Sequence, residues 1–209
     1  MHCSKRMRIN GTAMRTMMKI VYTIFLSFAL AGSLHAEEIK FKKAVLVQSD
    51  KNWALNADID VELSSALEQL VKKGVTLHFV TEFHLTRGRW YWFDEKVVDT
   101  QRTSKISYQA LTNQYRVTLG TFSLSAANLK QAMAAVSTLD DWAVIEQSNL
   151  NPNQIYTASV RMRLDTNQLA KPFQIDAINS KNWNLQSDWY RFEFIPKLNT
   201  STSLGVSNP

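Results

Sequence analysis

The sequence predicts an α+β fold that is mainly antiparallel β, in sandwich-like sheets, with two short helices. Most of the chain after residue 38 alternates apolar and polar side chains with a period of two, which is typical of half-buried strands. Only two stretches have helical spacing. The strands follow one another through short turns rather than through crossover helices, so a parallel Rossmann-type sheet is not expected.

Residues 1–36 predict a secretory signal peptide. A basic region ending at Lys19 precedes the apolar run 20–32, and Ala36 is a small residue before the predicted cut. Met17 or Met18 would give an ordinary signal length, so either is a candidate true start. The alternative is an uncleaved anchor, but the run is short of the ~20 apolar residues of a membrane-spanning helix. We expect a periplasmic protein, soluble after signal-peptide cleavage.

The charge balance changes once this segment is removed. The first 36 residues hold five of the 24 Lys and Arg residues and no acid, so 19 basic and 18 acidic residues remain, a net charge of +1. Such a balance gives no electrostatic footprint for nucleic acid. Cys3 is the only cysteine and is also removed, which excludes disulfides. We expect no later transmembrane segment, a single β-rich domain over 37–196 and a disordered polar tail over 197–209.

The first elements are two strands and a helix. Residues 39–48 and 53–63 alternate on either side of a polar turn. Ser65 and Glu68 then match a capping box, in which the two side chains satisfy free amides at a helix start. Gly74 supplies the residue that ends this helix.

The longest clean alternation, residues 75–95, predicts the central hairpin. Arg87-Gly88-Arg89 is the expected turn, and Trp90-Tyr91-Trp92-Phe93 the start of the returning strand. Residues 94–103 are polar and receive no assignment. A second helix is expected to begin at Ser123 or Ser125. Further strands are expected over 105–111, 114–121, 142–147, 155–165 and 184–195.

Four segments together carry a family resemblance: GVTLHFVTEFHLTRGRWYWFDEKV, ISYQALTNQYRV, YTASVRMRLD and NWNLQSDW. The chain resembles the domain of unknown function 4390 family of exported proteobacterial proteins over nearly all of its length after the signal. It departs from the family pattern at Ala170, where the family has proline. The resemblance implies a single-domain envelope protein with no assigned activity or catalytic residues. Proteins of this family are often encoded beside a membrane sensor kinase, which suggests a signalling context.

His78, Glu82 and His84 lie on one face of the predicted strand and are candidate metal ligands. A third ligand from elsewhere would be needed to complete such a site around Glu82 and His84. The alternative is a solvated polar face in which a glutamate hydrogen-bonds to a histidine.

Two rows of charged side chains on strand faces, which we call charged ladders, can also be interpreted in two ways. Opposed carboxylates can bind calcium or perform acid–base chemistry, but such ladders are more often cross-strand ion pairs, and we favour pairing if the two strands are neighbours. The ladders are Asp58, Asp60 and Glu62 on one strand, and Arg161, Arg163 and Asp165 on the other.

Arg87, Arg89, Trp90 and Trp92 are the candidate binding residues. If exposed, the two tryptophans form a stacking platform for a sugar or peptide, with arginine supplying cation–π contact. If the two tryptophans are buried, they anchor the core, and we favour this second interpretation.

No catalytic residues and no cofactor are predicted, because no nucleophile elbow, phosphate-binding loop or zinc-protease motif occurs in the sequence. We therefore expect a periplasmic binding or adaptor protein whose partner is an envelope protein, such as a membrane sensor, or a small ligand. The alternatives are a metal-assisted hydrolase acting on an envelope polymer, and a small-ligand carrier with a Trp-lined pocket.

Overall fold

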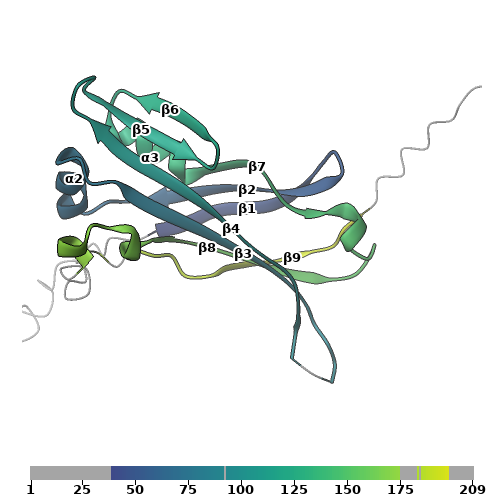
Figure 1. Ribbon diagram of the computed structural model, residues 1–209. Coiled ribbons are helices and arrows are strands. Elements are labelled where there is room, and N and C mark those ends of the chain that lie inside the picture. Colours follow the sequence, from purple (N-terminus) through teal and green to yellow (C-terminus); the bar gives the residue numbers. More distant parts are fainter. Residues whose placement is uncertain (1–38, 92, 175–182, 184, 198–209) are drawn as a thin grey trace, which may run out of the picture. The chain divides into compact units, whose positions relative to one another are not determined.

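Two antiparallel sheets form the body of the protein (Figure 1). The computed structural model describes residues 39–91, 93–174, 183 and 185–197, so the predicted signal peptide, Trp92 and the tail after Lys197 lie outside the described residues. One sheet has three strands in the order β1-β2-β7, and the other has six in the order β6-β5-β4-β3-β8-β9. The predicted α+β class, mainly antiparallel, is confirmed.

The elements follow one another through short connections. The strands are β1 (Ile39–Ser49), β2 (Asn52–Val61), β3 (Leu77–Arg87), β4 (Glu95–Gln109), β5 (Gln114–Leu119), β6 (Phe122–Ala126), β7 (Thr138–Glu146), β8 (Tyr156–Leu164) and β9 (Tyr190–Phe194). The helices are α2 (Ser65–Lys72) and α3 (Leu129–Ser137), with short 3₁₀ turns η1 (Gln147–Asn149) and η2 (Thr166–Gln168).

Both helix starts differ from the sequence prediction. The cap of α2 is Ser64, whose Oγ accepts a hydrogen bond from Leu67 N at 3.0 Å, so the capping box assigned to Ser65 is wrong by one residue. The cap of α3 is Asn128, whose side chain accepts from Gln131 N. The predicted cap residues Ser123 and Ser125 lie in β6 instead, because they pair with β5.

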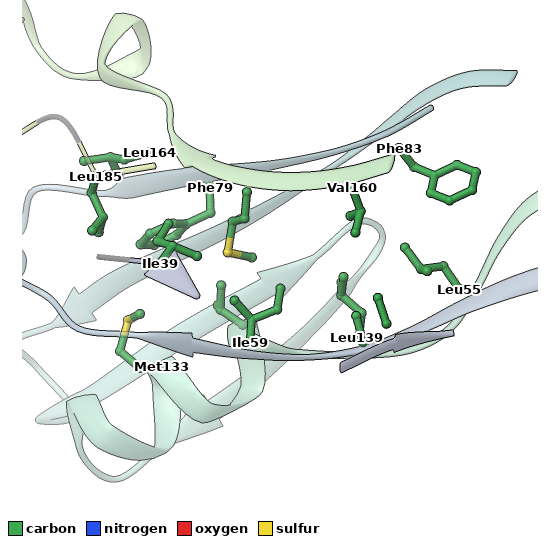
Figure 2. Packing of buried hydrophobic residues seen from close by; sticks show 14 of the residues in the cluster. Ile39, Leu55, Ile59, Phe79, Phe83, Met133, Leu139, Val160, Leu164 and Leu185 are labelled. Atoms are coloured by element: carbon green, nitrogen blue, oxygen red, sulfur yellow. The ribbon is translucent and has the colours of Figure 1, made fainter. Parts of the chain in front are cut away.

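The core lies between the two sheets. Figure 2 shows Phe79, Phe83 and Val160 of the six-stranded sheet pointing toward Leu55 and Ile59 of the other sheet. Strand β8 alternates strictly between buried and half-buried residues, as its sequence predicts. Apolar side chains from both sheets and both helices therefore share one cluster, which fixes the two sheets face to face.

The sandwich is closed along one side by aromatic rings. Phe41 of β1 stacks on Tyr190 of β9 with ring centroids 5.9 Å apart. Trp53 of β2 meets Phe194 of β9 edge to face at 4.8 Å. On the other side α3 packs against β4, β5 and β6, and it leads directly into β7.

The central hairpin is longer than predicted and its turn is different. The strands β3 and β4 pair from Leu77↔Ile106 to Arg87↔Glu95, so all of the unassigned stretch from Glu95 to Thr103 belongs to β4. The predicted returning strand over Trp90–Phe93 is wrong, since Trp90, Tyr91 and Phe93 lie in the loop between the strands. That loop extends beyond the ends of the other strands (Figure 1).

Candidate functional site

Three aromatic side chains stand in solvent at the end of the central hairpin. Trp90 is 94% exposed, Tyr91 64% and Phe93 84%, and we call these three residues the aromatic tip. The rings of Trp90 and Tyr91 pack edge to face, 5.2 Å apart. The interpretation of Trp90 as a core anchor is wrong, because the strand ends at Arg87 and leaves the following rings without a sheet to cover them. Trp92 lies outside the described residues.

The base of this loop is held by an ion-paired cluster, which we call the arginine clasp. Arg87 donates hydrogen bonds to Glu95 Oε2 through Nε and Nη2, and Arg89 Nη2 lies 2.7 Å from the same oxygen. Hydrogen bonds from Arg87 and then Arg89 lower the pKa of Glu95, so its carboxylate stays ionised. Both predicted binding arginines are thus committed to Glu95, and they shape the loop rather than point freely at a ligand.

The predicted metal ligands do not converge. Glu82 is engaged by two guanidiniums, with Arg161 Nε at 2.6 Å and Arg163 Nε at 2.9 Å from its two oxygens. His84 Nε2 lies 3.1 Å from Asp99 Oδ1, on the opposite strand β4. His78 lies six positions before His84 on the same strand, roughly 20 Å away at ~3.4 Å per residue. Among the described residues, no group of three or more His, Cys, Asp or Glu side chains is placed to hold a metal ion.

The two charged ladders do not face each other, because β2 and β8 belong to different sheets. Asp60 pairs instead with Lys42 of β1, at 3.1 Å. The two ladder arginines pair with Glu82 of β3, the direct neighbour of β8. The two ladder strands are therefore not the neighbours that mutual pairing required, and each ladder forms cross-strand ion pairs with a different strand.

The remaining tryptophans serve the core and the outer face of the six-stranded sheet. Trp53 and Trp183 are buried. Trp189 lies against the outer face, where its ring contacts His84 with centroids 4.5 Å apart and Arg161 lies over it at 4.5 Å. These contacts assemble a polar cluster around Glu82 rather than an open aromatic pocket.

A cleft of about 1260 Å³ is not the Trp-lined pocket expected of a carrier. It lies between the α2 and α3 helices and contains tyrosines in place of tryptophan, Tyr108 and Tyr115, whose rings contact each other at 5.1 Å. Burial raises the pKa of Tyr115, with Tyr108 and Glu68 adding to the shift. Charged side chains from Asp58, Lys42 and Lys72 share its rim.

Sequence reasoning missed Glu95 as the organiser of the loop and Trp189 as the partner of His84. The eight-residue spacing between Arg87 and Glu95 would have indicated a clasp if the loop had been assigned over 88–94. The contact of Trp189 with His84 had no local signal, because these residues are distant in sequence and only the order β3-β8-β9 brings them together.

Among the described residues, none of the helices has the length and apolar character that crossing a membrane requires. Comparison with curated proteins and with solved structures found no match. The family model described as "Domain of unknown function (DUF4390)" matches residues 36–193, which include every strand from β1 to β8 and most of β9. The chain therefore belongs to the DUF4390 family.

Proposed function

We propose that this protein is an exported, periplasmic binding or adaptor module that contacts another envelope protein through its aromatic tip. The observation that carries the proposal is the exposure of Trp90, 94%, at the end of a hairpin that extends beyond the sheets. Large aromatic side chains are the commonest anchors of protein interfaces, since each brings much apolar area with little conformational entropy to lose.

The arginine clasp supports this role by ordering the loop before a partner arrives. Four nitrogen atoms, Nε and Nη2 of both Arg87 and Arg89, share one carboxylate oxygen of Glu95, so the two ends of the loop are joined. A loop that is already ordered loses less entropy on binding, and this raises affinity. The first candidate partner is the extracytoplasmic domain of a membrane sensor, which the predicted export to the periplasm would bring within reach.

The alternatives receive less support from the geometry. A metal-assisted hydrolase would need His78, Glu82 and His84 together, yet Glu82 is neutralised by two arginines and the histidines lie far apart along β3. A carrier function would use the cleft between α2 and α3, whose rim is charged and which lacks the stacking tryptophans.

Recovery of envelope proteins by the purified chain tests the proposal. The variant Trp90→Ala/Phe93→Ala removes two exposed rings and leaves the arginine clasp in place. The matched control is Leu111→Ala/Phe122→Ala, which removes two exposed apolar side chains from the β4–β5 turn and from β6. We expect a specific partner to be recovered by the wild type and the control and lost with the tip variant. Equal recovery by all three proteins would exclude the aromatic tip as the contact surface.

A further inference from the structure

Two tyrosine side chains form one wall of the cleft between α2 and α3. Tyr108 of β4 and Tyr115 of β5 are direct cross-strand partners, and their ring centroids lie 5.1 Å apart. The neighbouring pair in the same row is Ile106 and Val117, both fully buried. The two rings therefore lie on the buried face of the six-stranded sheet, where the cleft reaches into the core.

The hydroxyl of Tyr115 has no protein partner. Tyr115 is only 7% exposed and lines the cleft, yet its hydroxyl forms no hydrogen bond with any described residue. The hydroxyl of Tyr108, by contrast, donates to Asn113 Oδ1. Buried polar side chains nearly always have a partner, either in the protein or in a bound molecule. The unsatisfied hydroxyl therefore indicates that the cleft holds a hydrogen-bonding occupant.

Glu68 of α2 contributes a second unsatisfied group to the same cleft. It is half-buried, and within the described ranges its carboxylate forms neither a hydrogen bond nor an ion pair, including with Lys72 one turn later. Burial raises the pKa of Tyr115, and the charges of Tyr108 and Glu68 raise it further. The carboxylate and the hydroxyl are therefore close enough to interact electrostatically, although no hydrogen bond joins them.

The other charged groups of the cleft lie at its exposed rim. The lining carries four carboxylates and three ammonium groups, those of Asp58, Asp60, Glu62 and Glu68 and those of Lys42, Lys72 and Lys130. Lys42 pairs with Asp60 at 3.1 Å. All of these residues except Glu68 are exposed, so water screens their charges. Glu68 is thus the charge that a ligand inside the cleft meets.

The remaining walls of the cleft are apolar. Ile59 of β2 and Met133 of α3 are buried there, and Val61 and Leu129 are half-buried. The volume of about 1260 Å³ is sufficient for a small molecule. The cleft therefore combines an apolar surface with one carboxylate, one hydroxyl and two aromatic rings.

We propose that this cleft binds a small organic amine, whose ammonium group donates hydrogen bonds to the Glu68 carboxylate and to the Tyr115 hydroxyl oxygen. The rings of Tyr108 and Tyr115 add cation–π attraction, and the apolar body of the amine lies against Ile59 and Met133. This site goes beyond the proposed contact with an envelope protein and does not depend on the aromatic tip.

Other classes of ligand fit the same groups less well. An anion would be repelled by Glu68, and a neutral alcohol would leave the partly buried carboxylate without a counter-charge. A metal ion prefers several oxygen ligands, and no group of three or more His, Cys, Asp or Glu side chains converges among the described residues. An ammonium group supplies both the charge and three donors, and so satisfies the carboxylate and the hydroxyl together.

Titration of the full chain with hexylamine, followed by ¹H–¹⁵N NMR, tests the proposal. Hexylamine carries a protonated ammonium group at pH 7. We expect saturable shifts in residues 59–72, 108–115 and 128–137, which surround the cleft. The controls are 1-hexanol and hexanoate, which have the same chain length with a neutral or a negative head. We expect both to bind at least about 10-fold more weakly than hexylamine.

Two conservative variants test the assigned groups. We expect Glu68→Gln to raise the Kd of hexylamine by about 10-fold or more, and Tyr115→Phe by roughly 3- to 10-fold. Glu62→Gln, at the exposed rim, is the matched control and should change the Kd by less than about 2-fold. Tyr115→Phe should leave the urea midpoint unchanged or higher, because the lost hydroxyl has no protein partner. Weaker binding by this variant then reports the hydroxyl rather than the fold.

A comparison with Nα-acetyl-lysine amide identifies the source of the amine. Tighter binding of hexylamine would support a free alkyl amine, and tighter binding of the lysine derivative would support a lysine side chain of a partner. Trp90→Ala/Phe93→Ala should leave the Kd of hexylamine unchanged, so the cleft and the aromatic tip are tested independently.

Three results would overturn the proposal. The first is equal affinity for hexylamine and 1-hexanol, which would show that charge is not recognised. The second is an unchanged Kd in Glu68→Gln. The third is a set of shifts that never saturate, which would mean that water alone bridges Glu68 and Tyr115.

Discussion

Glu82 on β3 and Arg161 on β8 are direct cross-strand partners, with Arg161 Nε 2.6 Å from Glu82 Oε2. Arg163 Nε donates to the other carboxylate oxygen at 2.9 Å, and Trp189 covers the Arg161 guanidinium at 4.5 Å. The Glu82 side chain is only 14% exposed. One carboxylate thus pairs with two guanidiniums on a partly shielded face, and the stability of that face depends on it.

Glu82→Gln should destabilise the protein by about 1–3 kcal/mol, a value between those of exposed and buried ion pairs, because it removes the carboxylate charge that Arg161 and Arg163 share and leaves Arg163 only Asp165, at 3.6 Å. Urea unfolding measures the loss. Asp60→Asn is the control, since it breaks the exposed pair with Lys42 and should cost less than about 1 kcal/mol. Equal losses in the two variants would contradict the special role of Glu82.

The same residue predicts an acid dependence. Burial raises the pKa of Glu82, but hydrogen bonds from Arg161 and Arg163 outweigh it and lower the pKa below its usual value. A lowered folded-state pKa contributes stability that is complete above the unfolded pKa of about 4.3 and is lost as the pH falls through the folded value. The difference between wild type and Glu82→Gln should therefore shrink below about pH 4. A difference that stays constant down to acid unfolding would refute this assignment.

His78 predicts a second dependence, near neutrality. Burial and the nearby charge of Lys105 lower its pKa, against an opposing effect of Asp165. The unfolded chain therefore binds the proton more readily, and stability falls as the pH drops through about 6.5. His78→Gln should flatten the stability profile between about pH 7 and 5. The measurement is the urea midpoint across that range, and an unchanged slope would count against the prediction.

Glu95 organises the loop that carries the aromatic tip. Glu95→Gln removes the charge that Arg87 and Arg89 share, so residues 88–94 should become more mobile while the sheets remain intact. Backbone ¹⁵N relaxation should show order parameters in the loop falling toward about 0.6 or below. Lys96→Gln, which breaks the neighbouring exposed pair with Asp99, should leave the loop unchanged. A rigid loop in Glu95→Gln would mean that packing of the rings, rather than the arginine clasp, orders it.

Trp53 holds the closed side of the sandwich through its ring. Its Nε1 is buried and finds no hydrogen-bond partner among the described residues, so the indole nitrogen contributes a cost rather than a gain. Trp53→Phe should therefore lower stability by less than about 1.5 kcal/mol, whereas Trp53→Ala should cost about 3–5 kcal/mol. Chemical denaturation of both variants gives the comparison. Similar losses would indicate that the indole nitrogen is satisfied in solution.

Strand positions and the buried faces were predictable from sequence because the alternation of side chains is local. Strand β8, with Tyr156 and Met162 inward, follows its pattern throughout. Element starts were less predictable. Ser64 and Ser65 are both good caps, and only the backbone conformation before α2 selects Ser64.

The aromatic tip shows where local reasoning fails. Trp90 and its neighbours have strand-forming side chains, and their alternation continues that of β3. Strand propensity assumes a neighbouring sheet, however, and the described pairing of β3 with β4 ends at Arg87↔Glu95, before the rings of the aromatic tip. The aromatic tip is exposed because the β3–β4 hairpin extends beyond the neighbouring strands. No local sequence pattern predicts how far the hairpin extends.

The sequence by itself determined the antiparallel α+β class, the central hairpin around Gly88 and the family resemblance, because periodicity and turn chemistry act between near neighbours. Only the tertiary structure decided that Glu82 meets Arg161 and Arg163, that Glu95 holds Arg87 and Arg89, and that Glu68 and Tyr115 line one cleft. These relationships join residues far apart in the chain or across a loop of unexpected length. They follow from strand order, which is set by the packing of the whole core rather than by any one segment.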